Sequence, residues 1–193
     1  GTMLDRESIE RIADLGESEV YAFGFTYIVW TEFLPRILEL GRTFEFADFK
    51  LFHSGGWKRL AAMEVSKERF SEETACVFGA SPGQILDFYG MAEQAGLIFV
   101  DCPEGHKHVP VFAQVIVRNV ADLGPCDPGQ PGMIEVMSSL GHSYFSQALL
   151  TEDLGSIGGV DDCPCGRLGR HFTFASRIER SELRGCGDTF RVS

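Results

Sequence analysis

The hydrophobic pattern of this 193-residue chain changes at Gly96, and that change constrains the fold more than any other feature. Before Gly96, segments with helical spacing of apolar residues alternate with short apolar runs typical of strands. After Gly96, short alternating segments are separated by Gly, Pro and Asp, as in antiparallel sheets. The pattern predicts an α/β (α+β) chain. We expect an α/β layer in residues 1–96 and a small antiparallel β-sheet or distorted barrel in residues 97–193.

The same pattern predicts the individual elements. Helices are expected over 4–15, 26–40 and 66–78, with a brief helical piece over 92–95. Strands are expected over 49–53, 85–89, 97–101, 109–118, 132–138, 148–150 and 171–175. Pro35 predicts a kink or a restart in the second helix, because proline removes a backbone donor. Since that helix is apolar on all sides, we expect it to be buried.

Charge and cysteine usage exclude several classes of protein. The chain has 17 Lys and Arg against 28 Asp and Glu, so its net charge is −11. An acidic chain is a poor partner for nucleic acid or an anionic membrane surface. No apolar run reaches the about 18 residues of a membrane-spanning helix. Gly1-Thr2-Met3 is too polar to begin an export signal, so we expect a cytoplasmic protein whose six cysteines are reduced.

The segment from Asp87 to Glu93 places reactive side chains at the end of an expected strand. Ligands of open α/β sheets bind beyond such strand ends. Tyr89 could stack on a base, Gly90 allows close backbone approach, and Glu93 could hold a divalent cation beside phosphates. On spacing alone, a core tyrosine and a solvated glutamate are the favoured alternative.

Ordered motifs along the chain resemble those of adenylate-forming enzymes. Tyr89-Gly90-Met91-Ala92-Glu93 resembles their Tyr-Gly-x-Thr-Glu motif, and 149–155 resembles the later Thr-Gly-Asp motif. The strand 129–136 is similar to the Gly-Glu-Leu strand between them. Residues 51–60 and 183–188 are closer to one branch of these enzymes. That branch contains the LuxE-type acyl-protein synthetases and the phenylacetate–CoA ligase-like enzymes. The resemblance places the chain in the later half of the large N-terminal adenylating domain.

The resemblance implies ATP and Mg²⁺ as cofactors and a carboxylic acid as substrate, with a fatty acid as one candidate. The acid would attack the α-phosphate of ATP and release pyrophosphate. The implied adenine slot is formed by Gly55, Gly56 and Tyr89, with Gly90 beside it and Asp87 accepting from the adenine amino group. In the same resemblance Asp153 binds both ribose hydroxyls, Arg177 also reaches the nucleotide, and Glu93 ligates Mg²⁺. A surface arginine is the alternative interpretation of Arg177.

Two parts of such enzymes are missing from the 193 residues. No Ser-Gly-Thr-Thr-Gly phosphate loop occurs, and the sequence ends just after the hinge-like Arg184-Gly185. We therefore expect the chain to be a fragment that does not catalyse adenylation alone. A partial domain exposes apolar surface, which favours a homo-oligomer.

The cysteines indicate a metal. Two thiolates of Cys163-Pro164-Cys165 can reach one ion, because residues i and i+2 of an extended segment point the same way. Cys102 and His108 lie in an expected hairpin and complete a Cys₃His set suited to structural zinc. His106 competes with His108 for the fourth position. Phenylacetate–CoA ligase-like relatives show a similar arrangement. The alternatives are free buried thiols, or an anion bound at 165–167.

Cys186 lies between two glycines and beside Arg184, where a thiolate is favoured. Acyl-protein synthetases pass the acyl group to a cysteine thiol, so the resemblance makes Cys186 a candidate catalytic acceptor and implies acyl-transferring protein partners. A small residue in a tight turn is the alternative. The chain as a whole is interpreted either as part of an adenylating ligase or as a non-catalytic, zinc-stabilised module that binds a nucleotide or a partner.

Overall fold

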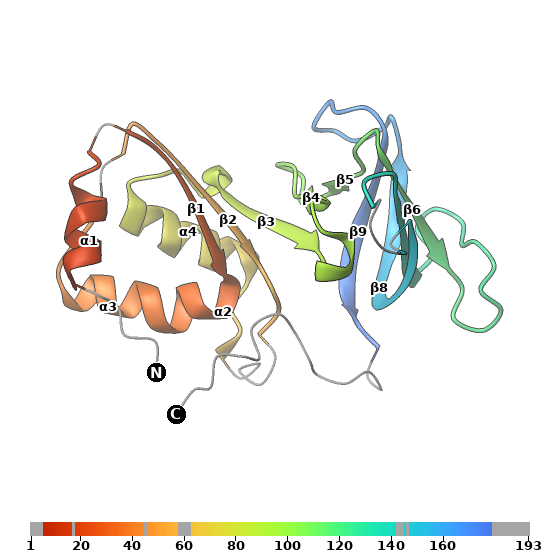
Figure 1. The fold of residues 1–193 in the computed structure, drawn as a ribbon, viewed down its shortest axis with the longest axis horizontal. Helices are drawn as coiled ribbons and strands as arrows, with labels where there is room; N and C mark the ends of the chain where they lie inside the picture. Colours follow the sequence, from red (N-terminus) through yellow and green to blue (C-terminus); the bar gives the residue numbers. More distant parts are fainter. Residues whose placement is uncertain are drawn as a thin grey trace. The chain divides into compact units, whose positions relative to one another are not determined.

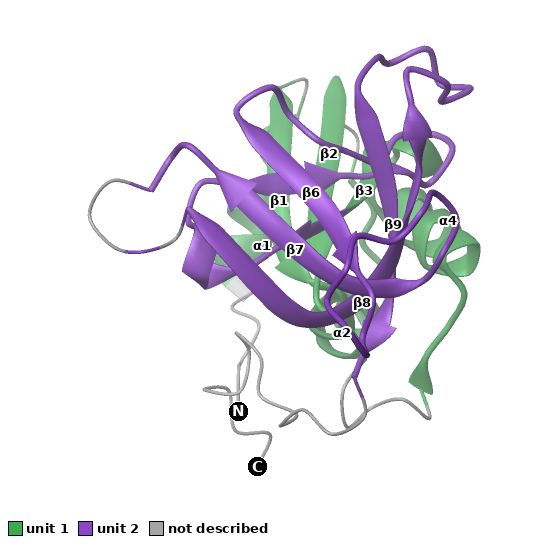
Figure 2. Ribbon diagram, turned by 90° about the vertical axis from the view of Figure 1, so that its right-hand side faces the viewer, with its two compact units in different colours: residues 1–87, 183–193 green, residues 88–182 purple. Residues whose placement is uncertain are grey.

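A computed structural model describes residues 6–16, 18–44, 46–57, 63–141, 145 and 147–178 of the chain. Contacts divide these residues into two units, one ending at Asp87 and the other beginning at Phe88 (Figure 2). The division falls inside one strand, β3 (Ile85–Gly90). The expected boundary at Gly96 stays a prediction, while the mixed α/β architecture is confirmed.

The first unit contains parallel strands and helices (Figure 1). In chain order they are α1 (Arg6–Ala13), β1 (Glu19–Phe25), α2 (Thr26–Ile28), the π-helix η1 (Val29–Phe33), α3 (Leu34–Glu39), β2 (Asp48–Ser54), α4 (Lys67–Phe78), the 3₁₀ turn η3 (Pro82–Gln84) and the start of β3. Strand β2 pairs in parallel with both β1 and β3. Among the described residues, no helix has the length and apolarity needed to cross a membrane.

The helix expected over 26–40 is confirmed and is interrupted before its proline. It runs from α2 through five π-helical residues, Val29–Phe33, into α3, where Pro35 occupies the first turn. The proline ring cannot donate a backbone hydrogen bond, so the wider π turn precedes it and the α-helix restarts there. Burial on all sides is wrong: Leu38 is 60% exposed, whereas Leu34 and Ile37 are buried.

Helix α4 begins and ends where the sequence predicts. The Ser66 side chain accepts a hydrogen bond from the Arg69 amide at 3.2 Å. Gly79 ends the helix in the left-handed conformation, with φ of +63°. Both caps use residue types that satisfy the unpaired backbone groups at helix ends.

Loss of the α4 cap is expected to lower stability modestly. Ser66→Ala removes the acceptor for the Arg69 amide, so the free energy of unfolding should fall by about 1 kcal/mol. Urea titration followed by circular dichroism measures the change. Ser71→Ala, inside the same helix, is the matched control and should be neutral or slightly stabilising, since alanine favours helix interiors. Equal stabilities for Ser66→Ala and wild type would contradict the cap's role.

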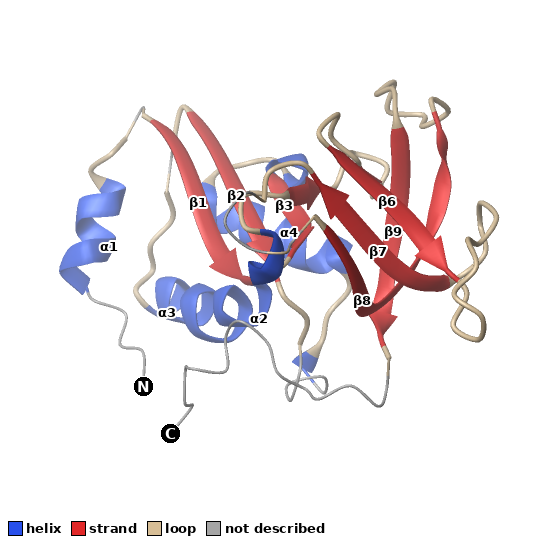
Figure 3. Ribbon diagram, turned by 45° about the vertical axis from the view of Figure 1, so that its right-hand side comes forward, coloured by secondary structure: helices blue, strands red, loops and turns tan. Residues whose placement is uncertain are grey.

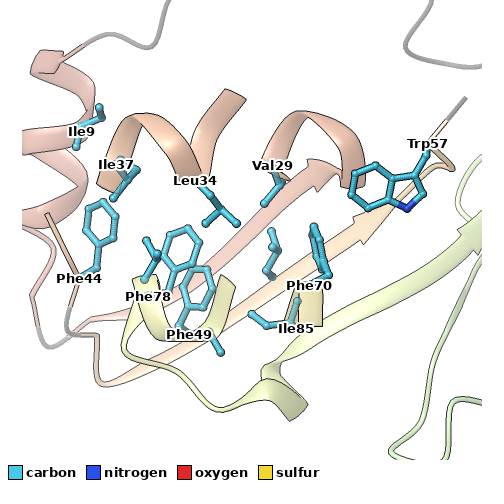
Figure 4. Packing of buried hydrophobic residues seen from close by; sticks show 13 residues of the cluster. Ile9, Val29, Leu34, Ile37, Phe44, Phe49, Trp57, Phe70, Phe78 and Ile85 are labelled. Atoms are coloured by element: carbon cyan, nitrogen blue, oxygen red, sulfur yellow. The ribbon is translucent and has the colours of Figure 1, made fainter. Parts of the chain in front are cut away.

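An aromatic core holds the first unit together. Figure 4 shows Leu34 and Ile37 pointing from the helical segment toward Phe49 of β2 and Phe78 of α4. The rings of Phe49 and Phe78 stack with centroids 4.1 Å apart. Stacked rings bury large areas and add pair energies of about 0.5–1.5 kcal/mol. This core fixes the strands whose ends carry candidate site residues.

The second unit is mostly antiparallel sheet (Figure 3). The end of β3 pairs with β4 (Ile98–Val100), and the 3₁₀ turn η4 (Ala92–Gln94) lies between them. The other strands are β5 (Lys107–His108), β6 (Ala113–Arg118), β7 (Gly132–Ser138), β8 (Ala148–Val160) and β9 (Arg170–Arg177), in the order β5-β9-β8-β7-β6. In the part of the chain that the structure describes, β5 and β6 are opposite edges, so this is the expected small sheet and not a closed barrel.

One face of this sheet forms the core of the second unit. Val115, Val117, Ile134 and Val136 are completely or almost completely buried, at alternate positions of β6 and β7. Phe172 of β9 packs in the same cluster. The alternation is that of a sheet with one covered face. The other positions are free to carry polar side chains.

Candidate nucleotide and metal sites

Three predicted site residues of the first unit, Gly55, Gly56 and Asp87, lie at the carboxyl ends of neighbouring parallel strands. Asp87 of β3 pairs directly with His53 of β2, two residues before Gly55. Gly55 has φ of +90°, a conformation that favours glycine, and a Cβ on Gly56 would meet nothing within 4 Å. The glycine turn and the Asp87 carboxylate therefore lie at the strand ends where open α/β sheets bind ligands.

Asp87 has a partner that the sequence did not indicate. The Lys67 ammonium, at the first position of α4, lies 2.8 Å from Asp87 Oδ2. Asp87 is largely shielded while Lys67 is mostly exposed. The expected acceptor for the adenine amino group is thus held by a cation.

Asp153 is the centre of a polar group in the second unit. The Tyr89 hydroxyl donates to Asp153 Oδ2 at 2.8 Å, and Arg177 Nε donates to Oδ1 at 3.0 Å. Asp153 is buried. The hydrogen bond to Asp153 raises the pKa of the Arg177 guanidinium. Each carboxylate oxygen has about two lone-pair sites and accepts one hydrogen bond from the described residues, so its geometry allows a further donor such as a ribose hydroxyl.

Tyr89 lies in an aromatic cluster. Its ring stacks with Phe174 at 5.5 Å and meets Phe172 edge-on at 6.1 Å. Burial, and then the charge of Asp153, raise the pKa of the Tyr89 hydroxyl, so the group stays a neutral donor. A Cβ on Gly90 would lie 3.2 Å from the Leu97 carbonyl oxygen, so the β3–β4 hairpin itself requires close approach there. The role of Tyr89 as a wall of the adenine slot stays a prediction.

Of the two predicted catalytic residues, Glu93 and Cys186, only Glu93 lies among the described residues. Glu93 lies in η4, and its side chain is exposed. An exposed carboxylate is accessible to a metal ion at the phosphates of a nucleotide. Cys186 is outside the described residues, as are 58–60 and 183–188 of the motifs.

The hairpin around β5 and the loop before β9 bring together the four predicted metal ligands. The donor atoms of Cys102, His108, Cys163 and Cys165 all lie within 4.8 Å of one another. Cys102 Sγ and Cys163 Sγ are 3.8 Å apart, and Cys165 Sγ is 3.3 Å from His108 Nε2. In tetrahedral zinc sites the corresponding edges are about 3.8 Å and about 3.6 Å. The donor set and its spacing fit zinc.

Burial and neighbouring hydrogen bonds shift the pKa values of these donors. Burial raises the pKa of the Cys163 thiol to about 11. A hydrogen bond from the Arg167 backbone lowers the pKa of Cys165. Burial lowers the pKa of His108, which favours the neutral imidazole that ligates metals. The competing residue, His106, points its Nδ1 at Cys163 Sγ, 3.3 Å away.

A family model for acyl-protein synthetase, LuxE, matches residues 5–192 of the chain. The match covers nearly every residue. The chain belongs to the LuxE acyl-protein synthetase family. The resemblance of the motifs is thereby confirmed at the level of the family. No match was found among curated proteins.

Solved structures similar to this LuxE-family chain are adenylate-forming enzymes. A 2-hydroxyisobutyryl-CoA ligase in an open conformation, with 2-HIB-AMP and CoA, superposes with a TM-score of 0.65 at 17% identity, over 90% of this chain and 39% of that one. A long-chain-fatty-acid–CoA ligase from Archaeoglobus fulgidus gives 0.57 at 15%, over 92% and 38%. ATP-bound MatB from Rhodopseudomonas palustris gives 0.50 at 18%, over 87% and 33%. At these identities the likeness shows the fold, and the LuxE-family chain spans well under half the length of these proteins.

Three residues near the candidate sites were missed by sequence reasoning. They are Lys67, which pairs with Asp87, and His171 and Asp162, which lie beside the metal-ligand group of this LuxE-family chain. Lys67 carried one signal, its position directly after a helix cap. Asp162 is next to Cys163 in sequence, whereas His171 gave no local signal, because only strand pairing brings β9 beside β5.

Proposed function

We propose that this LuxE-family protein activates a carboxylic acid with ATP. A carboxylate oxygen of the acid bonds to the α-phosphorus, the bond to the β-phosphate oxygen breaks, and pyrophosphate leaves with the electron pair. The observation that carries the proposal is the Asp153 group, a buried carboxylate that accepts one hydrogen bond on each oxygen among the described residues, in a chain matched by the LuxE model.

The described residues have distinct parts in binding. Asp153 accepts from the two ribose hydroxyls, because a carboxylate offers two parallel acceptors to a vicinal diol. Arg177 and the Tyr89 hydroxyl hold that carboxylate in one orientation. Gly55 and Gly56 leave room for the adenine, and Asp87 accepts from its amino group.

Mg²⁺ at the phosphates suits Glu93, since magnesium prefers oxygen ligands and is usually held by one or two carboxylates. Bound there, the ion would neutralise charge that develops on the α-phosphate. Glu93 is exposed and can turn toward a nucleotide without disturbing the core.

We also propose that Cys102, His108, Cys163 and Cys165 hold one structural zinc. Their donor distances fit a closed tetrahedral site. The ion would join the β4–β5 hairpin to the loop between β8 and β9, beside the short pairing of β5 with β9.

A fatty acid as substrate, Cys186 as thiol acceptor and an acyl-transferring protein partner complete the proposal, and they rest on the family alone. Transfer would join the acyl carbon to the thiolate sulfur and release AMP. Self-association is supported by Tyr21 and Phe23, which are 62% and 67% exposed on the edge strand β1.

Acid-dependent exchange of labelled pyrophosphate into ATP tests the proposal. The intact enzyme should support exchange with one class in a panel of carboxylic acids. The 193-residue chain alone should not, since one missing donor for the transferring phosphate costs about 10²–10³ in rate. An intact enzyme that binds zinc and shows no exchange with any acid would favour the non-catalytic module.

Loss of the Asp153 carboxylate is expected to weaken ATP binding. The ribose does not change charge in the reaction, so Asp153→Ala should raise KM for ATP about tenfold or more and leave kcat nearly unchanged. Steady-state kinetics with varied ATP and saturating acid separate the two constants. Glu152→Ala, an exposed neighbour on β8, should have wild-type kinetics. A change in kcat alone would contradict ribose binding by Asp153.

A further inference from the structure

A second group of metal-ligating side chains adjoins the first and shares one residue with it. Donor atoms of His106, Cys163 and His171 lie within 4.8 Å of one another. His106 Nδ1 is 3.3 Å from Cys163 Sγ, close to the about 3.6 Å edge of a tetrahedral zinc site. The two imidazole rings stack with centroids 4.5 Å apart.

His171 is prepared for ligation by its own surroundings. Its Nε2 lies 2.9 Å from Asp162 Oδ1, and its Nδ1 is buried without a hydrogen-bond partner among the described residues. A histidine that ligates a metal through one nitrogen typically donates the other N–H to a carboxylate. An orphaned buried nitrogen otherwise costs about 1–3 kcal/mol.

The backbone of Gly158 closely approaches the imidazole ring of His171. A Cβ built on Gly158 of β8 would lie 2.5 Å from His171 Nδ1. Any side chain at position 158 would therefore collide with the ring at Nδ1. Glycine leaves Nδ1 free of that contact.

We propose that His106, Cys163 and His171 hold a second divalent metal ion, with the Cys163 thiolate bridging it to the ion of the Cys₃His set. Three protein ligands leave one coordination position for water or another small ligand, as in exchangeable zinc sites. Charge is balanced in this arrangement: two divalent cations face three thiolates and the Asp162 carboxylate. With one ion, the same group carries two excess negative charges.

Zinc stoichiometry tests the proposal. The 193-residue chain is saturated with zinc chloride, desalted, and analysed by native mass spectrometry. Wild type should carry two zinc ions per chain, and His106→Asn and His171→Asn should carry one each. One ion on wild type, or two on His171→Asn, would overturn the proposal, and the second site would then be only a hydrogen-bonded shell. Neither result depends on adenylation activity.

Two aspartate-to-asparagine variants keep the test valid if the buried histidine variants fail to fold. Asp162 is 63% exposed, so Asp162→Asn should fold. Because it removes the carboxylate partner of His171, the second ion should bind about 10–100-fold more weakly in chelator competition. Asp161→Asn is the matched control and should stay within about twofold of wild type, since Asp161 instead accepts from the Gly169 amide. Equal second-site affinity in Asp162→Asn and wild type would refute the proposal.

Discussion

Removal of the proposed structural zinc is expected to destabilise the second unit of the chain strongly. The ligands Cys102, His108, Cys163 and Cys165 come from two loops and one two-residue strand, and their donor atoms gather within 4.8 Å. Structural zinc contributes apparent binding free energies of about 10–16 kcal/mol in small zinc domains, which is as large as the whole stability of a typical domain, about 5–15 kcal/mol. Without the metal, the four donors would lose the ion that joins their two segments.

Thermal unfolding of the metal-loaded and the chelator-treated chain measures this effect. The chelated chain should melt at least about 10 °C lower, since each kcal/mol shifts the Tm of a unit this size by about 4–8 °C. Cys102→Ser should reproduce the loss. Cys76→Ser, at an exposed position on α4, is the matched control and should melt like wild type. A metal-free chain with an unchanged Tm would refute the structural zinc.

The second large effect is expected at Glu93. In the intact enzyme, Glu93→Ala should lower kcat for adenylation by about 100-fold or more, because charge building on the α-phosphate would lose the Mg²⁺ that we propose this carboxylate holds. The side chain is exposed in η4, so stability should hardly change. Adenylate formation at saturating ATP and acid gives the rate, and unfolding in urea gives the stability.

Two comparisons make the Glu93 result specific. Glu72→Ala removes an equally exposed carboxylate from α4 and should leave kcat unchanged. Raised Mg²⁺ should partly restore Glu93→Ala, which is not expected for Asp153→Ala. If Glu93→Ala keeps the wild-type kcat, the likeness of 89–93 to the adenylation motif is one of fold alone.

The sequence predicted the elements whose signals are local. Helix α4 was predicted from Ser66, a residue type that caps helix starts, and β7 was predicted with its bounds, Gly132–Ser138, because a Gly- and Pro-rich turn precedes an apolar-rich run. The interruption before Pro35 also followed from one residue. Each of these signals arises from backbone hydrogen bonding or side-chain period within a few residues.

Elements that depend on distant neighbours were missed or shortened. Strand β1 was not predicted, because Tyr21 and Phe23 on its exposed face hide the alternation with the covered positions. Strand β8 was expected over 148–150 but extends to Val160. Glycine is disfavoured in strands, yet a Cβ on Gly155 would lie 2.2 Å from the Thr173 carbonyl oxygen, so close packing against β9 requires it.

The candidate metal site was likewise predicted in part from the sequence and decided in part by the tertiary structure. The sequence by itself determined the donor types and predicted that Cys102, Cys163 and Cys165 belong together. It favoured His108 and kept His106 as a competitor, because residues two apart in an extended segment face the same side. Only the tertiary structure placed His108 against Cys165 and His106 against Cys163, since that choice depends on how β9 and its preceding loop pair with β5.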